Sequence, residues 1–81
     1  MFIVSEYDLN PGHGESHMVW VYNDEKAARR DFEKCVKKTS EIFPGLDVDE
    51  NSAHWEGVND DGPVVYDLVI VEVEGRWVND K

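Results

Sequence analysis

A short acidic segment of the chain has the residue types of a calcium-binding loop. Asp47, Asp49 and Asn51 would take its first, third and fifth positions, and Ca²⁺ prefers oxygen ligands at this spacing. The sixth position is Ser52 instead of the glycine that the sharp turn needs, and the twelfth is Val58 instead of a bidentate glutamate. The sequence therefore favours weak cation association with the segment over a specific calcium site.

Three histidines and one cysteine are the other candidates for site chemistry. His13 and His17 flank Glu15, so with His54 they form a candidate zinc-ligand set. The Pro-Gly context of His13 argues against a helix that would turn both residues the same way, which favours ordinary surface histidines. A small histidine-based metal-binding domain is kept as the third alternative for the function. Cys35 belongs to an apolar stripe, where a buried structural thiol is expected rather than a nucleophile.

No other residue pattern predicts a reaction. The glycines of the first connection lack the spacing of a phosphate-binding loop, and in so acidic a chain a pair of carboxylates carries no information on its own. We therefore expect no catalytic residue, no bound cofactor and no metal, and a protein that is not an enzyme.

The distribution of charge is the most informative feature of the sequence. The chain has 81 residues and a formal net charge of −10, yet six of its eight Lys and Arg side chains fall between positions 24 and 42. A long stretch with acids and no Lys or Arg runs from Leu46 to Gly62, and we predict that it forms an acidic loop bearing one tryptophan. The predicted partner-binding residues are Asp47, Asp49, Glu50, Trp55, Glu56, Asp60 and Asp61.

Such a loop would bind a protein rather than a nucleic acid. Clustered carboxylates speed the encounter with a basic surface and accept charge-assisted hydrogen bonds from its arginines, and an exposed Trp55 could anchor the contact. The net charge excludes nucleic-acid binding by overall attraction, and no apolar run is long enough to span a membrane. The alternative is a loop that is solvated and has no binding role.

Two strand-like runs and one helix account for the first half of the chain. Residues 2–7 and 18–22 are rich in β-branched and aromatic types, and the turn residues between them predict a hairpin. Asn23 or Asp24 supplies a helix N-cap, and a Pro-Gly pair ends the helix. The helical spacing predicts one apolar stripe, made of Ala28, Phe32, Cys35, Val36, Thr39 and Ile42.

The second half contains the strongest strand of the sequence. Residues 64–73 alternate between a face with Tyr66, Leu68 and Ile70 and a valine-rich face, and residues 52–58 predict a short edge strand. The valine-rich face needs cover from the C-terminal segment around Trp77, from a second copy of the chain or from another partner. The alternative function is accordingly a structural or regulatory domain that dimerises through Val65, Val69, Val71 and Val73.

Together these elements predict a single α+β domain over residues 1–81, of ββαββ type, with one helix packed on an antiparallel sheet. The start of the chain lacks the basic and apolar stretches of a secretory signal, and a lone cysteine forms no internal disulfide. We therefore expect a cytoplasmic protein.

The layout of the chain also resembles a class of known proteins. The residues that carry this resemblance are Met1 to Asp8, the stretch from Met18 to Ala27 that enters the helix, and Tyr66 to Val73. In this layout the chain is similar to small acidic proteins encoded by phages and mobile elements, which include anti-CRISPR inhibitors and other anti-defence factors. The resemblance implies a stoichiometric inhibitor that covers a basic, nucleic-acid-binding surface of a host complex. On that interpretation, replacing the loop carboxylates by amides abolishes inhibition while folding is kept.

Overall fold

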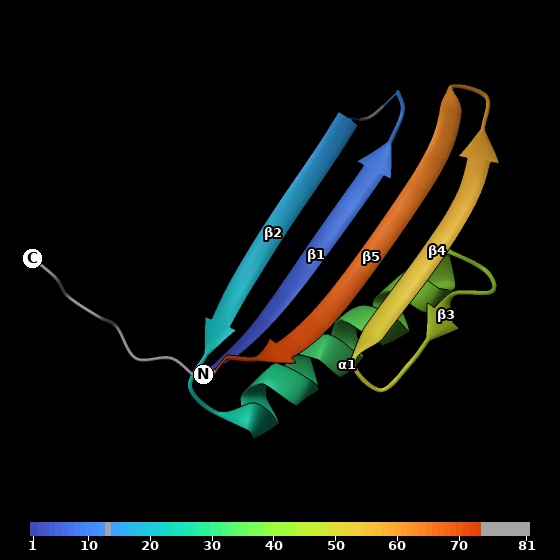
Figure 1. Ribbon diagram of the computed structural model, residues 1–81. Coiled ribbons are helices and arrows are strands. Elements are labelled where there is room, and N and C mark those ends of the chain that lie inside the picture. The colour runs from blue at the N-terminus through green and yellow to red at the C-terminus, as the bar shows by residue number, and fades with distance from the viewer. Residues whose placement is uncertain (13, 74–81) are drawn as a thin grey trace, which may run out of the picture.

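The computed structural model describes residues 1–12 and 14–73 and shows one helix lying across one face of an antiparallel sheet (Figure 1). Its elements are β1 (Phe2–Asn10), β2 (Gly14–Tyr22), α1 (Glu25–Ile42), β3 (Asp47–Val48), β4 (Ser52–Asn59) and β5 (Gly62–Glu72). The strands pair in the order β2-β1-β5-β4-β3. The α+β class is confirmed, but the expected ββαββ order needs a correction because the two-residue strand β3 joins the sheet beside β4.

β1 and β2 form the predicted hairpin, and both strands are longer than expected. Their pairing runs without a bulge from Phe2 opposite Tyr22 to Asn10 opposite Gly14. The turn between them contains Gly12 at a φ of 96°, a left-handed backbone angle that glycine adopts without steric cost. β2 is the outermost strand of the sheet, so the second side of its backbone pairs with no strand of the described residues.

α1 begins where the sequence predicts. The Asp24 side chain caps the helix by accepting a hydrogen bond from the Lys26 backbone N–H at 3.2 Å. The helix ends before Phe43, whose N–H donates to the Thr39 carbonyl at 2.8 Å. Within the described part of the chain, no helix combines the length and the apolar character needed to cross a membrane.

The predicted apolar stripe of α1 is confirmed over most of its length. Its buried members are Ala28, Phe32 and Thr39, and its half-buried members are Cys35 and Val36. The prediction is wrong for the last position, since Ile42 is 61% exposed. At this end of the helix the side chain borders an open cavity beside β1 and β2 instead of packing on the sheet.

β5 lies at the centre of the sheet, between β1 and β4. Its residues alternate as predicted, with Val64, Tyr66, Leu68 and Ile70 buried on the side of α1. The last three of these pack with Phe32 of the helix and with buried residues of the two neighbouring strands in one hydrophobic core. β5 therefore contributes side chains to the middle of both faces of the sheet.

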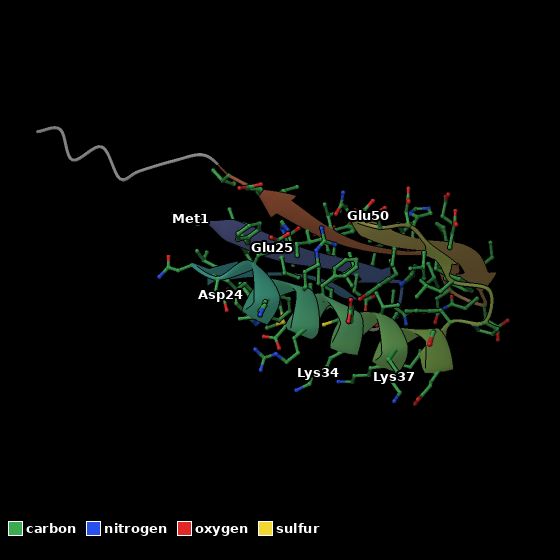
Figure 2. All side chains as sticks on the ribbon, turned by 90° about the horizontal axis from the view of Figure 1, so that it is seen from below. Met1, Asp24, Glu25, Lys34, Lys37 and Glu50 are labelled. Atoms are coloured by element: carbon green, nitrogen blue, oxygen red, sulfur yellow. The ribbon has the colours of Figure 1, made fainter. Side chains whose placement is uncertain are left out.

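None of the described residues covers the opposite face of the sheet, which we call the open face (Figure 2). Figure 2 shows the sheet edge-on, with α1 on one side of it. Successive residues of a strand point to opposite faces, so the pairing register assigns the side chains of the open face. These are Ile3, Ser5, Tyr7, Leu9, Glu15, His17, Val19, Val21, Asp47, Ser52, His54, Glu56, Val58, Pro63, Val65, Asp67, Val69 and Val71.

Candidate functional site

The acids predicted to form one loop do not lie together. Asp49 and Glu50 precede β4, whereas Asp60 and Asp61 follow it at the turn into β5. An eight-residue strand such as β4 is about 26 Å long, so these two pairs lie at opposite ends of the sheet. The prediction of a single acidic loop is therefore wrong, because most of the segment is strand that pairs with β3 and β5.

Trp55 is half-buried and packs against the hydrophobic core. Its ring stacks on Phe43 with the ring centroids 4.7 Å apart, and its indole N–H donates to the Pro44 carbonyl at 3.0 Å. Gly57 lies next to it on the same face, where a side chain would overlap the indole ring. Trp55 therefore fastens the end of α1 to β4. The expectation of an exposed ring is wrong, while a contact of Trp55 with a partner stays a prediction.

The turn that resembles a calcium loop is held by the helix. Arg29 donates to the Glu50 carbonyl at 2.7 Å and to the Asn51 side-chain oxygen at 2.6 Å. Asp49 accepts a hydrogen bond from the Glu50 backbone N–H at 2.7 Å. The guanidinium thus occupies an oxygen that a calcium ion would need, and it fixes this turn against α1.

A row of polar side chains crosses the open face, with one residue from each strand. The register places His17, Tyr7, Asp67, His54 and Asp47 opposite one another in that order. Adjacent strands lie about 4.8 Å apart, so neighbouring members of the row are within side-chain reach. Only the last of these five belongs to the predicted partner-binding set.

His54 links two carboxylates of this surface. Its Nδ1 lies 2.5 Å from Asp67 Oδ1, and its Nε2 lies 2.9 Å from Glu56 Oε2. Only the protonated imidazole donates from both nitrogens, and the two hydrogen bonds raise the pKa of His54 above its ordinary value, with the Asp67 bond the larger cause. The ring therefore carries positive charge over a wider pH range than a free histidine.

A second carboxylate contact lies further along the same face. Tyr7 donates its hydroxyl proton to Glu15 Oε2 at 2.6 Å, and this hydrogen bond is the main reason that the pKa of Tyr7 is raised. The Tyr7 ring also meets His17 edge-to-face, with the centroids 6.2 Å apart. These contacts fix side chains in the acidic half of the open face, by which we mean the part that carries Glu15, Asp47, Glu56 and Asp67.

The other half of the open face is apolar. Ile3 lies between Val21 and Val71 in one row, and Val19 and Val69 flank Ser5 in the next. The exposed fractions are 58% for Val21, 45% for Val71 and 53% for Val19. These side chains form an exposed apolar patch beside the carboxylates of the open face.

No lysine or arginine of the described residues lies on the open face. All six described Lys and Arg residues belong to α1, and Figure 2 shows Lys34 and Lys37 on the outer side of the helix. The open face carries four carboxylates, namely Glu15, Asp47, Glu56 and Asp67. The two sides of the molecule thus differ strongly in charge.

The histidines singled out in the sequence do not share a site. His17 and His54 are in the same row, but β1 and β5 separate them by three strand spacings, or about 14 Å. His13 lies outside the described residues. Among residues 1–12 and 14–73 there is no group of three side chains that could hold a metal ion.

Cys35 has the environment expected of a structural thiol. It is half-buried beside the core, and burial is the largest reason that the pKa of its thiol is raised. A raised pKa keeps the sulfur protonated and therefore unreactive at neutral pH.

Two acids of the open face, Glu15 and Asp67, are not among the partner-binding residues predicted from the sequence. Both lie on strands outside the 46–62 segment, and strand pairing brings them to the face that also carries Asp47 and Glu56. Alternation along each strand could have indicated the face to which these two side chains point, but the sequence does not give the strand order.

Comparison of the chain with protein-family models, curated proteins and solved structures found no match.

Proposed function

We propose that this protein is a non-enzymatic binding module that covers a basic surface of a host protein or nucleoprotein complex. The open face of the sheet is the contact surface in this proposal. The observation that supports it is the charge of that face, which carries four carboxylates and, among the described residues, no lysine or arginine. Complementary charge guides the encounter with a basic partner and favours the correct orientation.

The apolar half of the open face supplies the area that a stable contact needs. Ile3, Val19, Val21, Val69 and Val71 form a flat patch beside the acidic half. A partner that fits both halves presents apolar side chains next to arginines or lysines. Burial of the valines provides affinity, while the carboxylates select the basic partner.

Of the seven partner-binding residues predicted from the sequence, Asp47 and Glu56 are kept in this proposal, and Glu15 and Asp67 join them. Asp49, Glu50, Asp60 and Asp61 lie at the two ends of β4, where they add to the general negative potential. They are the natural comparison set for an experiment, since they equal the open-face acids in number.

The resemblance to anti-defence proteins suggests the first partner to test. A CRISPR effector complex binds nucleic acid through a positively charged channel. A protein that lays an acidic sheet face over such a channel would exclude the nucleic acid. Inhibition by this route needs one inhibitor per complex and no chemical step.

The test compares two variants that each lose four negative charges. The open-face variant contains Glu15→Gln, Asp47→Asn, Glu56→Gln and Asp67→Asn. The control variant contains Asp49→Asn, Glu50→Gln, Asp60→Asn and Asp61→Asn. Binding of a labelled target to a purified, guide-loaded CRISPR effector is measured with each protein present, at about 0.05 M and about 0.3 M NaCl, and folding is checked by circular dichroism.

The proposal expects the parent and the control variant to inhibit target binding, more strongly at low salt, and the folded open-face variant to lose inhibition. Equal inhibition by both variants would remove the open face from the mechanism. A tight homodimer whose stability does not depend on salt, seen by sedimentation, would favour the alternative in which the valine-rich face joins two copies.

A further inference from the structure

β2 lies at the rim of the sheet and carries apolar side chains on both faces. Met18, Trp20 and Tyr22 are on the helix side, and they alternate with Val19 and Val21 on the open face. A strand with apolar residues on both faces is typical of the inside of a sheet, where both faces are covered. Most of β2 is nevertheless exposed. Its composition is therefore that of an inner strand with one neighbour missing.

The outer backbone edge of β2 is free to pair. Its inner edge pairs with β1 in an unbroken register, and no strand of residues 1–12 and 14–73 pairs with the outer edge. Natural proteins usually block such an edge with a lysine, a proline, a bulge or a very short strand, and β2 contains none of these devices. The free N–H and C=O groups can therefore accept a further strand.

The charge of β2 indicates which strand fits there. The seven residues from Ser16 to Tyr22 contain no Asp, Glu, Lys or Arg, so they offer a basic partner strand no carboxylate to bind. Two copies of a chain with a net charge of −10 repel each other, but these segments can meet without bringing like charges together. Short segments with high β-propensity, no proline and little charge also pair readily with identical segments. Charge therefore favours a second copy over a basic strand.

We propose that β2 pairs antiparallel with β2 of a second copy and joins the two sheets into one. Met18 of each copy lies beside the indole ring of Trp20 of the other copy, where the sulfur contacts the aromatic edge. Pairing at the rim leaves the open face uncovered, so it is independent of the proposed function. It also differs from a dimer through Val65, Val69 and Val71, which would stack two sheets face to face.

The position of Glu15 selects the register of this pair. A pair centred on Val19 joins residues 16–22 of both copies and leaves Glu15 beyond the last pair. It also places Met18 opposite Trp20. A pair centred on Met18 would include all of β2, but it would place each Glu15 opposite Val21, where the valine displaces water from the carboxylate. The register centred on Val19 avoids this cost.

The helices leave room for the second copy. An antiparallel pair of identical strands has a two-fold axis normal to the sheet, so both helices lie on the same side of the joined sheet. α1 packs on β1 and β5, and the two β1 strands are three strand spacings apart, or about 14 Å. Packed helices need only about 8–10 Å, so the two helices do not collide.

Sedimentation equilibrium of the full chain tests the association at about 5–500 µM protein and at about 0.05 M and about 0.5 M NaCl. We expect a reversible dimer with a dissociation constant of about 10 µM at the higher salt, since one strand pair is a small interface. Because the copies repel each other, the dissociation constant should be at least about threefold larger at the lower salt. A monomer under all of these conditions overturns the proposal.

Hydrogen exchange, read by mass spectrometry, identifies the surface that joins the copies. The backbone amides of β2 should exchange more slowly at about 500 µM than at about 5 µM protein, because the outer N–H groups become hydrogen-bonded in the dimer. β5, which already pairs on both sides, should exchange equally at both concentrations. A dimer in which β2 gains no protection, as expected for sheets stacked through their valine-rich faces, overturns the proposal.

Two matched variants complete the design. Val19→Lys places a cation opposite the same cation of the second copy, so it should weaken dimerisation at least about tenfold. Val58→Lys makes the same change at an exposed valine of β4 on the open face and should dimerise like the parent. Circular dichroism checks that both variants fold, and a folded Val19→Lys that dimerises like the parent contradicts the proposal. If Val19→Lys does not fold, hydrogen exchange of the parent decides.

Discussion

At the scale of single residues, His54 connects the acids of the open face through its own charge. Its hydrogen bonds to Asp67 and Glu56 raise the imidazole pKa above the ordinary 6.5. An NMR titration should therefore give a pKa above 6.5. The pKa should fall more after Asp67→Asn than after Glu56→Gln, because the Asp67 bond has the larger effect. An unshifted pKa in the parent protein would contradict this geometry.

The same shift makes the stability of the fold depend on pH. Because the folded-state pKa of His54 is raised, its stabilising contribution is fully present below pH 6.5 and is lost as the pH rises through the folded-state pKa. His54→Gln should therefore lower the urea midpoint more below pH 6.5 than at a pH above the folded-state pKa of His54. His17→Gln is the control, since no carboxylate contact of His17 occurs among the described residues.

Asp8 has the opposite effect on stability near neutral pH. Its folded-state pKa is raised above 3.8, so stability falls as the pH rises through that pKa and the buried oxygen becomes charged. Asp8→Asn should stabilise the protein at pH 7 by about 1 kcal/mol, and by much less below pH 3.8. Urea unfolding at both pH values measures the difference. A variant that is less stable than the parent at pH 7 would show that Asp8 has a favourable partner.

At the scale of the elements, the contact between the end of α1 and β4 depends on a glycine. A side chain at Gly57 would overlap the Trp55 ring, which is stacked on Phe43. Gly57→Ala should therefore destabilise the fold by about 2 kcal/mol. The same substitution in a Trp55→Phe background should cost less, because the smaller ring leaves room for the methyl group. Equal costs in the two backgrounds, measured by urea unfolding, would mean that the ring is not the obstacle.

The elements also show which features a sequence can predict. The Asp24 cap and the alternation of Tyr66, Leu68 and Ile70 depend on neighbouring residues, and both were predicted correctly. The side of the sheet to which Trp55 points was not predicted correctly. Alternation defines two faces of a strand without telling which one the helix covers. The grouping of Glu15 with Asp67 needs the strand order, which arises from contacts between distant segments.

At the scale of the whole molecule, the excess of negative charge opposes folding. Raising the NaCl concentration from about 0.01 M to about 1 M shortens the Debye length from about 30 Å to about 3 Å, which screens this repulsion. The parent protein, with its net charge of −10, should therefore unfold at a higher urea concentration at high salt. The four-substitution open-face variant should gain less, and an equal gain would place the repulsion elsewhere.

The two outer strands of the sheet, β2 and β3, differ in how well they could pair with an added strand. β2 offers nine residues without lysine, proline or a bulge, which are the usual protections of a free edge, whereas the opposite rim is the two-residue strand β3. An added strand would therefore dock beside β2. If that strand were the β2 of another copy, both outer rims would then be too short to recruit a third, and assembly would stop at a pair.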